Sequence, residues 1–150
     1  MRVVLQRVSS ATVRVDGIEI ARIGRGILAL VGISSEDTRG DLEWMARKII
    51  ELRIFDDHEG KLNLSLQEIG GEVLLVSQFT LYGDCRKGRR PSYSDAAPPA
   101  LAEKLYEEFV SIVRQLVPAV QSGRFQAMMD VELINAGPVT LLLDSHGRPA

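Results

Sequence analysis

Polar residues at the end of an apolar run are the first candidates for chemistry in this sequence. The apolar run from Val73 to Val76 predicts a strand buried on both faces. Ser77, Gln78 and Thr80 follow it with two hydroxyls and an amide. A buried polar group without a partner costs about 1–3 kcal/mol. These side chains therefore either bond to nearby backbone or face a ligand, and both interpretations stay open.

Residues 131–143 form a second unusual stretch. Two apolar segments are interrupted there by Asn135, Ala136, Gly137 and Pro138. Proline has no N–H to donate to a sheet, so Gly137-Pro138 predicts a turn, a bulge or a cis peptide bond.

The side chains of ordinary hydrolases are hard to assemble from this sequence. His58 falls in a predicted turn and His146 near the C-terminal end, so neither is well placed as a general base. The sequence has no G-x-S-x-G motif and no metal-ligand spacing, so we expect no metal. Thr80 and Cys85 remain as nucleophiles of a conventional esterase, although each would be weak without a base. A dimeric, non-catalytic binder of RNA ends or metabolites is a third hypothesis.

The elements that must position these residues follow from hydrophobic periodicity. Two helices are predicted, one capped by Asp37 or Thr38 and one opening at Pro98-Pro99 and stopped by Pro118. Their expected core-facing residues are Leu42, Met45, Ile49 and Leu52 in the first helix, and Leu101, Leu105, Phe109, Ile112 and Leu116 in the second. Strands are predicted at residues 3–8, 11–15, 18–23, 27–33, 73–76, 125–134 and 139–143.

The order of these elements predicts one α/β domain, residues 1–150, with helices on one side of layered sheet. Residues 83–99 are the longest irregular segment, and long ordered loops are often functional. Residues 145–150 are expected to be a frayed tail.

The composition is that of a soluble domain, with 45% hydrophobic and 25% charged residues. Cys85 is the only cysteine, and neither a signal-peptide core nor an 18-residue apolar run occurs, so we expect a cytoplasmic protein with no membrane span. The net charge of −2 argues against coating nucleic acid by bulk electrostatics. The basic cluster from Arg86 to Arg90 is either a solvated loop or a contact for an RNA end.

The motifs S-Q-F-T-L (residues 77–81) and N-A-G-P-V-T (residues 135–140) together resemble the signature motifs of D-aminoacyl-tRNA deacylases. The resemblance extends to the opening M-R-V-V-L-Q-R-V, the middle L-R-I-F-D-D-H-E-G-K-L-N and the loop K-G-R-R-P-S-Y. It implies a homodimer with a three-layer β/β/α fold, antiparallel-rich sheets and two main helices. It also implies a cofactor-free hydrolase that removes D-amino acids from the aminoacyl-tRNA 3′ end as chiral proofreading, with glycyl-tRNA as a further substrate.

The resemblance assigns roles to residues of the first motif. The backbone N–H groups of Phe79 and Thr80 would stabilise the oxyanion, and Ser77 and Gln78 belong to the same substrate-binding strand. The 2′-hydroxyl of the terminal adenosine would help to activate the attacking water, which fits a sequence without a catalytic base.

The second motif would act as the chirality filter. In the family the peptide matching Gly137-Pro138 is cis and enters the partner's pocket, where its carbonyl oxygens hold the substrate's amino group and exclude an L side chain. Arg7 matches a residue that braces this motif, while Phe125 and Met129 match positions lining the adenine pocket. As alternatives, Arg7 is a surface charge and Phe125 and Met129 are core residues. The sequence departs from common family residues at Gly83, Gln126 and Ala136.

Overall fold

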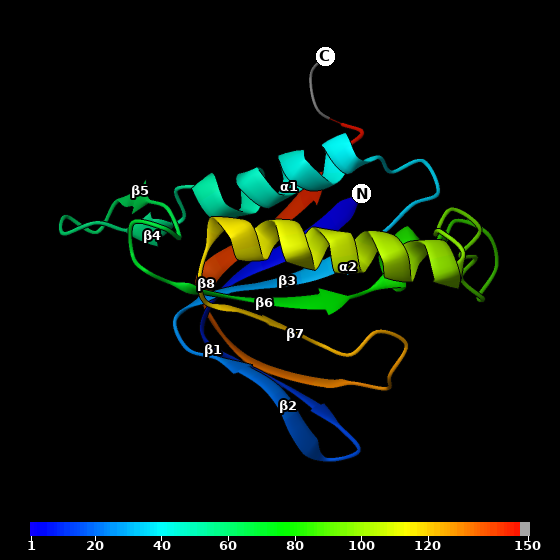
Figure 1. The fold of residues 1–150 in the computed structure, drawn as a ribbon, viewed down its shortest axis with the longest axis horizontal. Coiled ribbons are helices and arrows are strands. Elements are labelled where there is room, and N and C mark those ends of the chain that lie inside the picture. The colour runs from blue at the N-terminus through cyan, green and yellow to red at the C-terminus, as the bar shows by residue number, and fades with distance from the viewer. Residues whose placement is uncertain (148–150) are drawn as a thin grey trace.

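The structure, a computed structural model, describes residues 1–147 (Figure 1). Its elements are β1 (Arg2–Val15), β2 (Ile18–Ile23), β3 (Gly26–Gly32), α1 (Arg39–Glu51), β4 (Phe55–Asp56), β5 (Leu62–Leu64), β6 (Glu72–Ser77), the 3₁₀ helix η1 (Phe79–Tyr82), α2 (Pro99–Leu116), β7 (Val120–Ser122) and β8 (Asp130–Asp144).

The strands form a mixed sheet in the order β2-β1-β3-β6-β7, with β8 paired to β1. The first half of β1 pairs with β3 and its second half with β2, while β8 runs antiparallel along both halves. β1 and β8 therefore pass from a layer beneath the two helices into a further layer below it (Figure 1). This arrangement confirms the predicted α/β fold with three layers, β/β/α.

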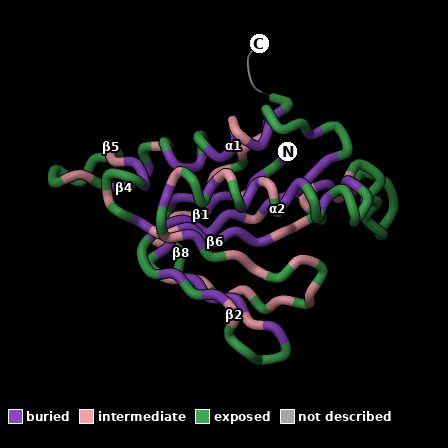
Figure 2. Tube along the Cα trace, viewed as in Figure 1, coloured by how far each residue is buried: buried purple, intermediate pink, exposed green. Residues whose placement is uncertain are grey.

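The central strands are buried on both faces because the layers enclose two apolar cores. In β6, Val73 and Leu75 pack with the helices in the larger core, whereas Leu74 and Val76 pack against the lower layer in the smaller one. All four are at most 1% exposed, and burying each contributes about 1.5–3 kcal/mol. The same strands form the buried centre of Figure 2. The prediction from the apolar run at 73–76 is therefore confirmed.

Both helices begin where their capping residues predict. At the start of α1, the N–H and hydroxyl of Thr38 donate to the Asp41 carboxylate at 2.9 and 2.6 Å. Pro99 is the first residue of α2. The expectation that Leu101 faces the core is wrong, since it is 37% exposed and Ala102 faces inward in that turn. Within the described residues, neither helix is long and apolar enough to cross a membrane.

The C-terminal strands differ from the prediction. β8 is a single strand from Asp130 to Asp144, residues 124–129 lie outside the strands, and β7 was not anticipated. The interruption at Gly137-Pro138 does not end the strand because the pairing of β1 with β8 shifts register on both sides of Val8. The Gly137–Pro138 peptide is cis. The motif therefore occupies a bulge within a continuous strand.

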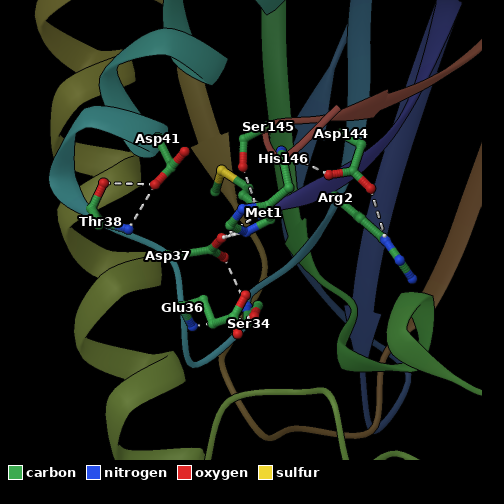
Figure 3. A network of polar contacts seen from close by, with 10 residues as sticks. All are labelled: Met1, Arg2, Ser34, Glu36, Asp37, Thr38, Asp41, Asp144, Ser145 and His146. Atoms are coloured by element: carbon green, nitrogen blue, oxygen red, sulfur yellow. Dashed lines mark hydrogen bonds and ion pairs between the residues drawn. The ribbon is translucent and has the colours of Figure 1, made fainter. Parts of the chain in front are cut away.

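The expectation of a frayed tail is wrong at Ser145 and His146, while residues 148–150 lie outside the described part of the chain. Ser145 is 1% exposed, and its hydroxyl lies 2.7 Å from the N-terminal ammonium of Met1. That ammonium also donates to the buried carboxylate of Asp37, which accepts the Ser34 N–H at 2.8 Å and lies 2.9 Å from His146 Nε2 (Figure 3). Both ends of the described chain are thus tied to the loop before α1.

Candidate active site

A cavity of about 850 Å³ opens where β6 ends, beside the start of α2 and the loop before β8. Five residues predicted for the site line this cavity together: Ser77, Gln78, Phe79, Phe125 and Met129. Its volume lies within the range of about 300–1,000 Å³ that is typical of small-molecule sites. The two stretches that supply these residues are far apart in sequence, and the fold brings them to one place.

The chain turns sharply after β6 because η1 packs closely against the end of β3. Gln78 N–H donates to Val31 O at 2.7 Å, and a Cβ on Gly32 would lie 3.1 Å from Leu81 Cβ and 3.2 Å from Gln78 O. Glycine at position 32 therefore permits this close approach. The turn leaves the Phe79 side chain 57% exposed at the cavity rim.

The first backbone N–H groups of η1 lack acceptors within the turn. A 3₁₀ helix bonds each N–H to the carbonyl three residues earlier, so its first N–H groups are left over. Phe79 and Thr80 occupy these positions, and within the described residues no acceptor is assigned to either N–H. Two donors are thus available next to the cavity.

The Thr80 side chain is not arranged as a nucleophile. Thr80 lies in η1 rather than in the strand, is exposed, and accepts a hydrogen bond from Gln78 Nε2 at 2.5 Å. Thr80 and Cys85 are both absent from the cavity lining, and Cys85 is exposed. His58 is 89% exposed, whereas His146 contacts Asp37. None of the described cavity-lining residues is a histidine, cysteine or carboxylate.

The far wall of the cavity is positioned by Tyr106, which the sequence reasoning missed. Its hydroxyl donates to Leu75 O at 2.9 Å, and its ring lies 5.9 Å from that of Phe125. Burial raises the pKa of Tyr106, so the phenol stays protonated as a donor. A Cβ on Gly123 would lie 2.7 Å from the sulfur of Met129, so glycine there makes room for Met129 at the wall.

Arg7 lies on the bulge that contains Gly137-Pro138. Its Nε donates to Ala136 O at 2.7 Å, and its Nη1 donates to Ile54 O at 2.7 Å and to Asp56 at 3.2 Å. The side chain is only 12% exposed, so the alternative of a free surface charge is wrong. Arg7 therefore contacts the peptide that directly precedes Gly137.

Asn135 lies inside the second motif, but the sequence did not predict the hydrogen bonds that its side chain makes. Its amide Nδ2 donates to Arg7 O at 3.2 Å and to Val139 O at 3.1 Å. The side chain therefore bridges across Gly137-Pro138 and ties the bulge to β1. A Cβ added at Gly137 would overlap Asn135 Oδ1.

Arg7, Gly137 and Pro138 do not line the cavity of their own protomer. Arg7 pairs with Ile27 near the start of β3, whereas Ser77 pairs with Val31 near its end. The four-residue separation corresponds to about 13 Å along the strand. The two halves of the predicted site therefore occupy different ends of the sheet. Among residues 1–147, no group of three or more histidine, cysteine or acidic side chains could hold a metal ion.

Comparison with known proteins identifies the family. A sequence profile described as D-Tyr-tRNA(Tyr) deacylase matches residues 4–144. The chain is 60% identical over 145 residues to a D-aminoacyl-tRNA deacylase of Desulfatibacillum aliphaticivorans. The match covers 97% of this chain and 99% of the relative. It is 58% identical over 145 residues to a D-aminoacyl-tRNA deacylase of Thermosipho africanus, with 97% of each covered.

Two solved structures share the fold. One, described as a c-Myc DNA unwinding element binding protein, matches with a TM-score of 0.92 and 43% identity over 100% of both chains. The other, described as a probable eukaryotic D-amino acid tRNA deacylase, has a TM-score of 0.80 and 21% identity over 95% of this chain and 97% of its own. The resemblance seen in the two motifs is confirmed. The chain therefore belongs to the D-Tyr-tRNA(Tyr) deacylase family, a family of hydrolases.

Proposed function

We propose that this protein hydrolyses the ester bond between a D-amino acid and the 3′ end of tRNA, releasing both. The observation that carries this proposal is the cavity at the end of β6. Among residues 1–147, two backbone donors at its edge have no assigned acceptor, and no nucleophile paired with a base lines it. The names of the relatives at 58–60% identity support the same substrate class.

In the proposed reaction, water attacks the ester carbonyl and negative charge develops on its oxygen. The N–H groups of Phe79 and Thr80 would donate hydrogen bonds to this oxyanion, since backbone donors fixed before the reaction need no reorganisation. The 2′-hydroxyl of the terminal adenosine would help to activate the water. Phe125 and Met129 offer an apolar surface for the adenine. Hydrolysis then breaks the acyl–oxygen bond and returns the 3′-hydroxyl to the tRNA.

Rejection of L-amino acids would come from a second copy of the chain. Gly137-Pro138 lies away from its own cavity, so it completes a site only if it enters the cavity of a partner. Within the described residues β8 pairs only with β1, which leaves its other edge open. Ile134 and Leu142 of this strand are 63% and 82% exposed. An open edge with exposed apolar side chains favours pairing with another chain, and a two-fold dimer would complete both sites at once.

The decisive experiment compares single-turnover cleavage of D-tyrosyl-tRNA and L-tyrosyl-tRNA. We expect rapid release of D-tyrosine and little release of L-tyrosine. Cleavage of both esters at similar rates would favour a conventional esterase. Tight binding of tRNA ends without release of either amino acid would favour the non-catalytic binder.

A further inference from the structure

A loop of residues 84–92, called the basic loop here, carries charge that the proposed chemistry does not use. It contains four exposed cations: Arg86, Lys87, Arg89 and Arg90. The loop is closed at its base, where Asp84 N–H donates to Ser92 O at 2.7 Å and Ser92 N–H donates to Asp84 O at 3.0 Å. It is therefore a defined hairpin-like feature.

Asp84 holds the basic loop and neutralises one of its cations. The Asp84 carboxylate accepts the backbone N–H of Arg86 at 2.9 Å and the guanidinium at 2.9 and 2.7 Å. Arg86 lowers the pKa of Asp84 to about 2, so the pair remains charged at neutral pH. Gly88 supplies a positive φ of 70° at the tip. Within residues 1–147, Lys87, Arg89 and Arg90 have no carboxylate within ion-pair distance.

The basic loop is anchored at the rim of the cavity. Tyr93 follows it directly, lines the cavity and contacts the ring of Phe79 edge-on at 5.1 Å. A Cβ on Gly83 would lie 3.0 Å from Tyr93 Cε1, so the two ends of the loop pack together there. In Figure 1 the loops between η1 and α2 gather at the end of the molecule where α2 begins. The unpaired cations therefore lie within a few residues of the cavity rim.

We propose that Lys87, Arg89 and Arg90 bind the phosphate backbone of the tRNA acceptor stem and so hold the ester end in the cavity. This inference rests on the proposed function. The net charge of −2 gives RNA no overall attraction, and screening over about 8–10 Å means that only nearby cations act on a phosphate. Phosphate contacts fix the position of a nucleic acid without reading its sequence. The loop would therefore strengthen binding of many tRNAs alike.

The test compares two triple variants with the same loss of charge. Lys87→Gln, Arg89→Gln and Arg90→Gln change the basic loop. In the control, Arg47→Gln, Arg53→Gln and Arg114→Gln change exposed cations on α1, just after α1 and in the last turn of α2. Each protein is assayed on D-tyrosyl-tRNA and on the D-tyrosyl ester of adenosine, which has no phosphate. Salt is varied, and Kd for uncharged tRNA is measured in parallel.

For the basic-loop variant, we expect kcat/KM on D-tyrosyl-tRNA to fall about tenfold or more at low salt, mainly through KM. The slope of log kcat/KM against log salt should become shallower by about 2, because each lost phosphate contact removes about 0.7–0.9. Cleavage of the adenosine ester should stay unchanged. Kd for uncharged tRNA should rise by the same factor, and the control variant should match the wild type.

Three outcomes would overturn the inference. Equal losses of kcat/KM on both substrates would assign the loop a structural role. A loss in the control variant equal to that in the basic-loop variant would assign the effect to overall charge. An unchanged salt slope and an unchanged Kd for tRNA would show that the loop does not contact phosphates. Failure of the wild type to cleave either ester would instead reject the proposed function, and the tRNA Kd would still test the loop.

Discussion

Thr80 illustrates how the backbone and the side chain of one residue can differ in importance. Within the described part of the chain, its N–H at the start of η1 has no assigned acceptor. Its hydroxyl accepts a hydrogen bond from Gln78, and the residue does not line the cavity. A threonine without a base is a weak nucleophile. The backbone is thus the part of Thr80 that we expect to act, and the backbone survives most substitutions.

We therefore predict that Thr80→Ala and Cys85→Ala each keep deacylation within about threefold of the wild type. By contrast, a tRNA ending in 2′-deoxyadenosine should react orders of magnitude more slowly, because it lacks a group that acts chiefly in the transition state. Single-turnover cleavage of D-tyrosyl-tRNA measures both effects. Equal rates on the 2′-hydroxyl and 2′-deoxy substrates, together with a loss in Thr80→Ala, would return Thr80 to the role of nucleophile.

Adding one methyl group at Gly137 should test the proposed role of Gly137-Pro138 as the chirality filter. Because a Cβ there would overlap Asn135 Oδ1, Gly137→Ala should displace the amide that ties the bulge to Arg7 and Val139. We predict at least tenfold slower cleavage of D-esters without efficient L-cleavage, since about 1.4 kcal/mol of lost positioning gives that factor.

The measurement for this variant is single-turnover cleavage of D-Tyr, D-Asp, Gly and L-Tyr esters of tRNA. If Gly137-Pro138 holds only the amino group, the wild type should cleave both D-esters similarly and should also cleave the glycyl ester. Strong discrimination between the two D-esters, or a resistant glycyl ester, would mean that the pocket reads side chains.

Single residues were predictable where a polar side chain stood out from an apolar strand. Ser77 and Gln78 were found in this way and line the cavity, whereas Thr80, found in the same way, does not; Phe79, which also lines it, was proposed from the family resemblance. Tyr106 was missed because it lies outside the predicted apolar stripe of its helix, and the hydrogen bond from its hydroxyl to Leu75 O depends on how the helix packs on the sheet. Asn135 was visible in its motif, but its contact with Arg7 depends on pairing across 128 residues of chain.

At the scale of elements, periodicity located β3, β6 and both helices because each has a continuous or regularly spaced apolar pattern. It failed near β7, a three-residue strand that is too short for a period to be read. It also failed at Gly137-Pro138, where a strand continues through a proline because a bulge accommodates it. Local sequence patterns do not predict where a strand ends when pairing with a distant strand decides whether it continues.

The loop before α1 carries the buried carboxylate of Asp37. Figure 3 shows the contacts of Asp37, and from them we expect this residue to stabilise the fold. Its buried carboxylate accepts the N-terminal ammonium and the Ser34 N–H. We predict that Asp37→Ala lowers the free energy of unfolding by about 3–5 kcal/mol, because it leaves a buried positive charge without its partner.

Urea unfolding measures this loss, and Asp144→Ala is the matched control. Asp144 pairs with Arg2 at 3.1 Å, but both side chains are 41–48% exposed, so that pair should contribute less than about 1 kcal/mol. Equal effects of the two substitutions would show that burial does not set the strength of the Asp37 interaction.

At the scale of the whole molecule, the two motifs belong to the same sheet but lie near different ends of it. β1 pairs with both β3 and β8, and this pairing fixes Gly137-Pro138 near one end of β3 and the cavity at the other. The fold class followed from the order of the elements, but this separation did not, because it depends on the register of the long β1–β8 pair. Because the sheet holds Gly137-Pro138 away from its own cavity, we propose that a second chain completes the site.

The proposed dimer can be tested by mixing two variants that each lack a different half of the site. Ala127 lines the cavity, and Ala127→Trp should block it while leaving Gly137-Pro138 intact. Gly137→Ala should damage the filter while leaving the cavity intact. Each variant alone should be nearly inactive on D-tyrosyl-tRNA.

After the two variants are unfolded and refolded together in equal amounts, about half of the dimers should be mixed, and each mixed dimer should hold one intact site. The sample should then contain about a quarter of the intact sites of the wild type. Recovery of activity near that level would establish that the partner supplies Gly137-Pro138. No recovery, despite mixed dimers demonstrated by differently tagged chains, would mean that each protomer builds its site alone.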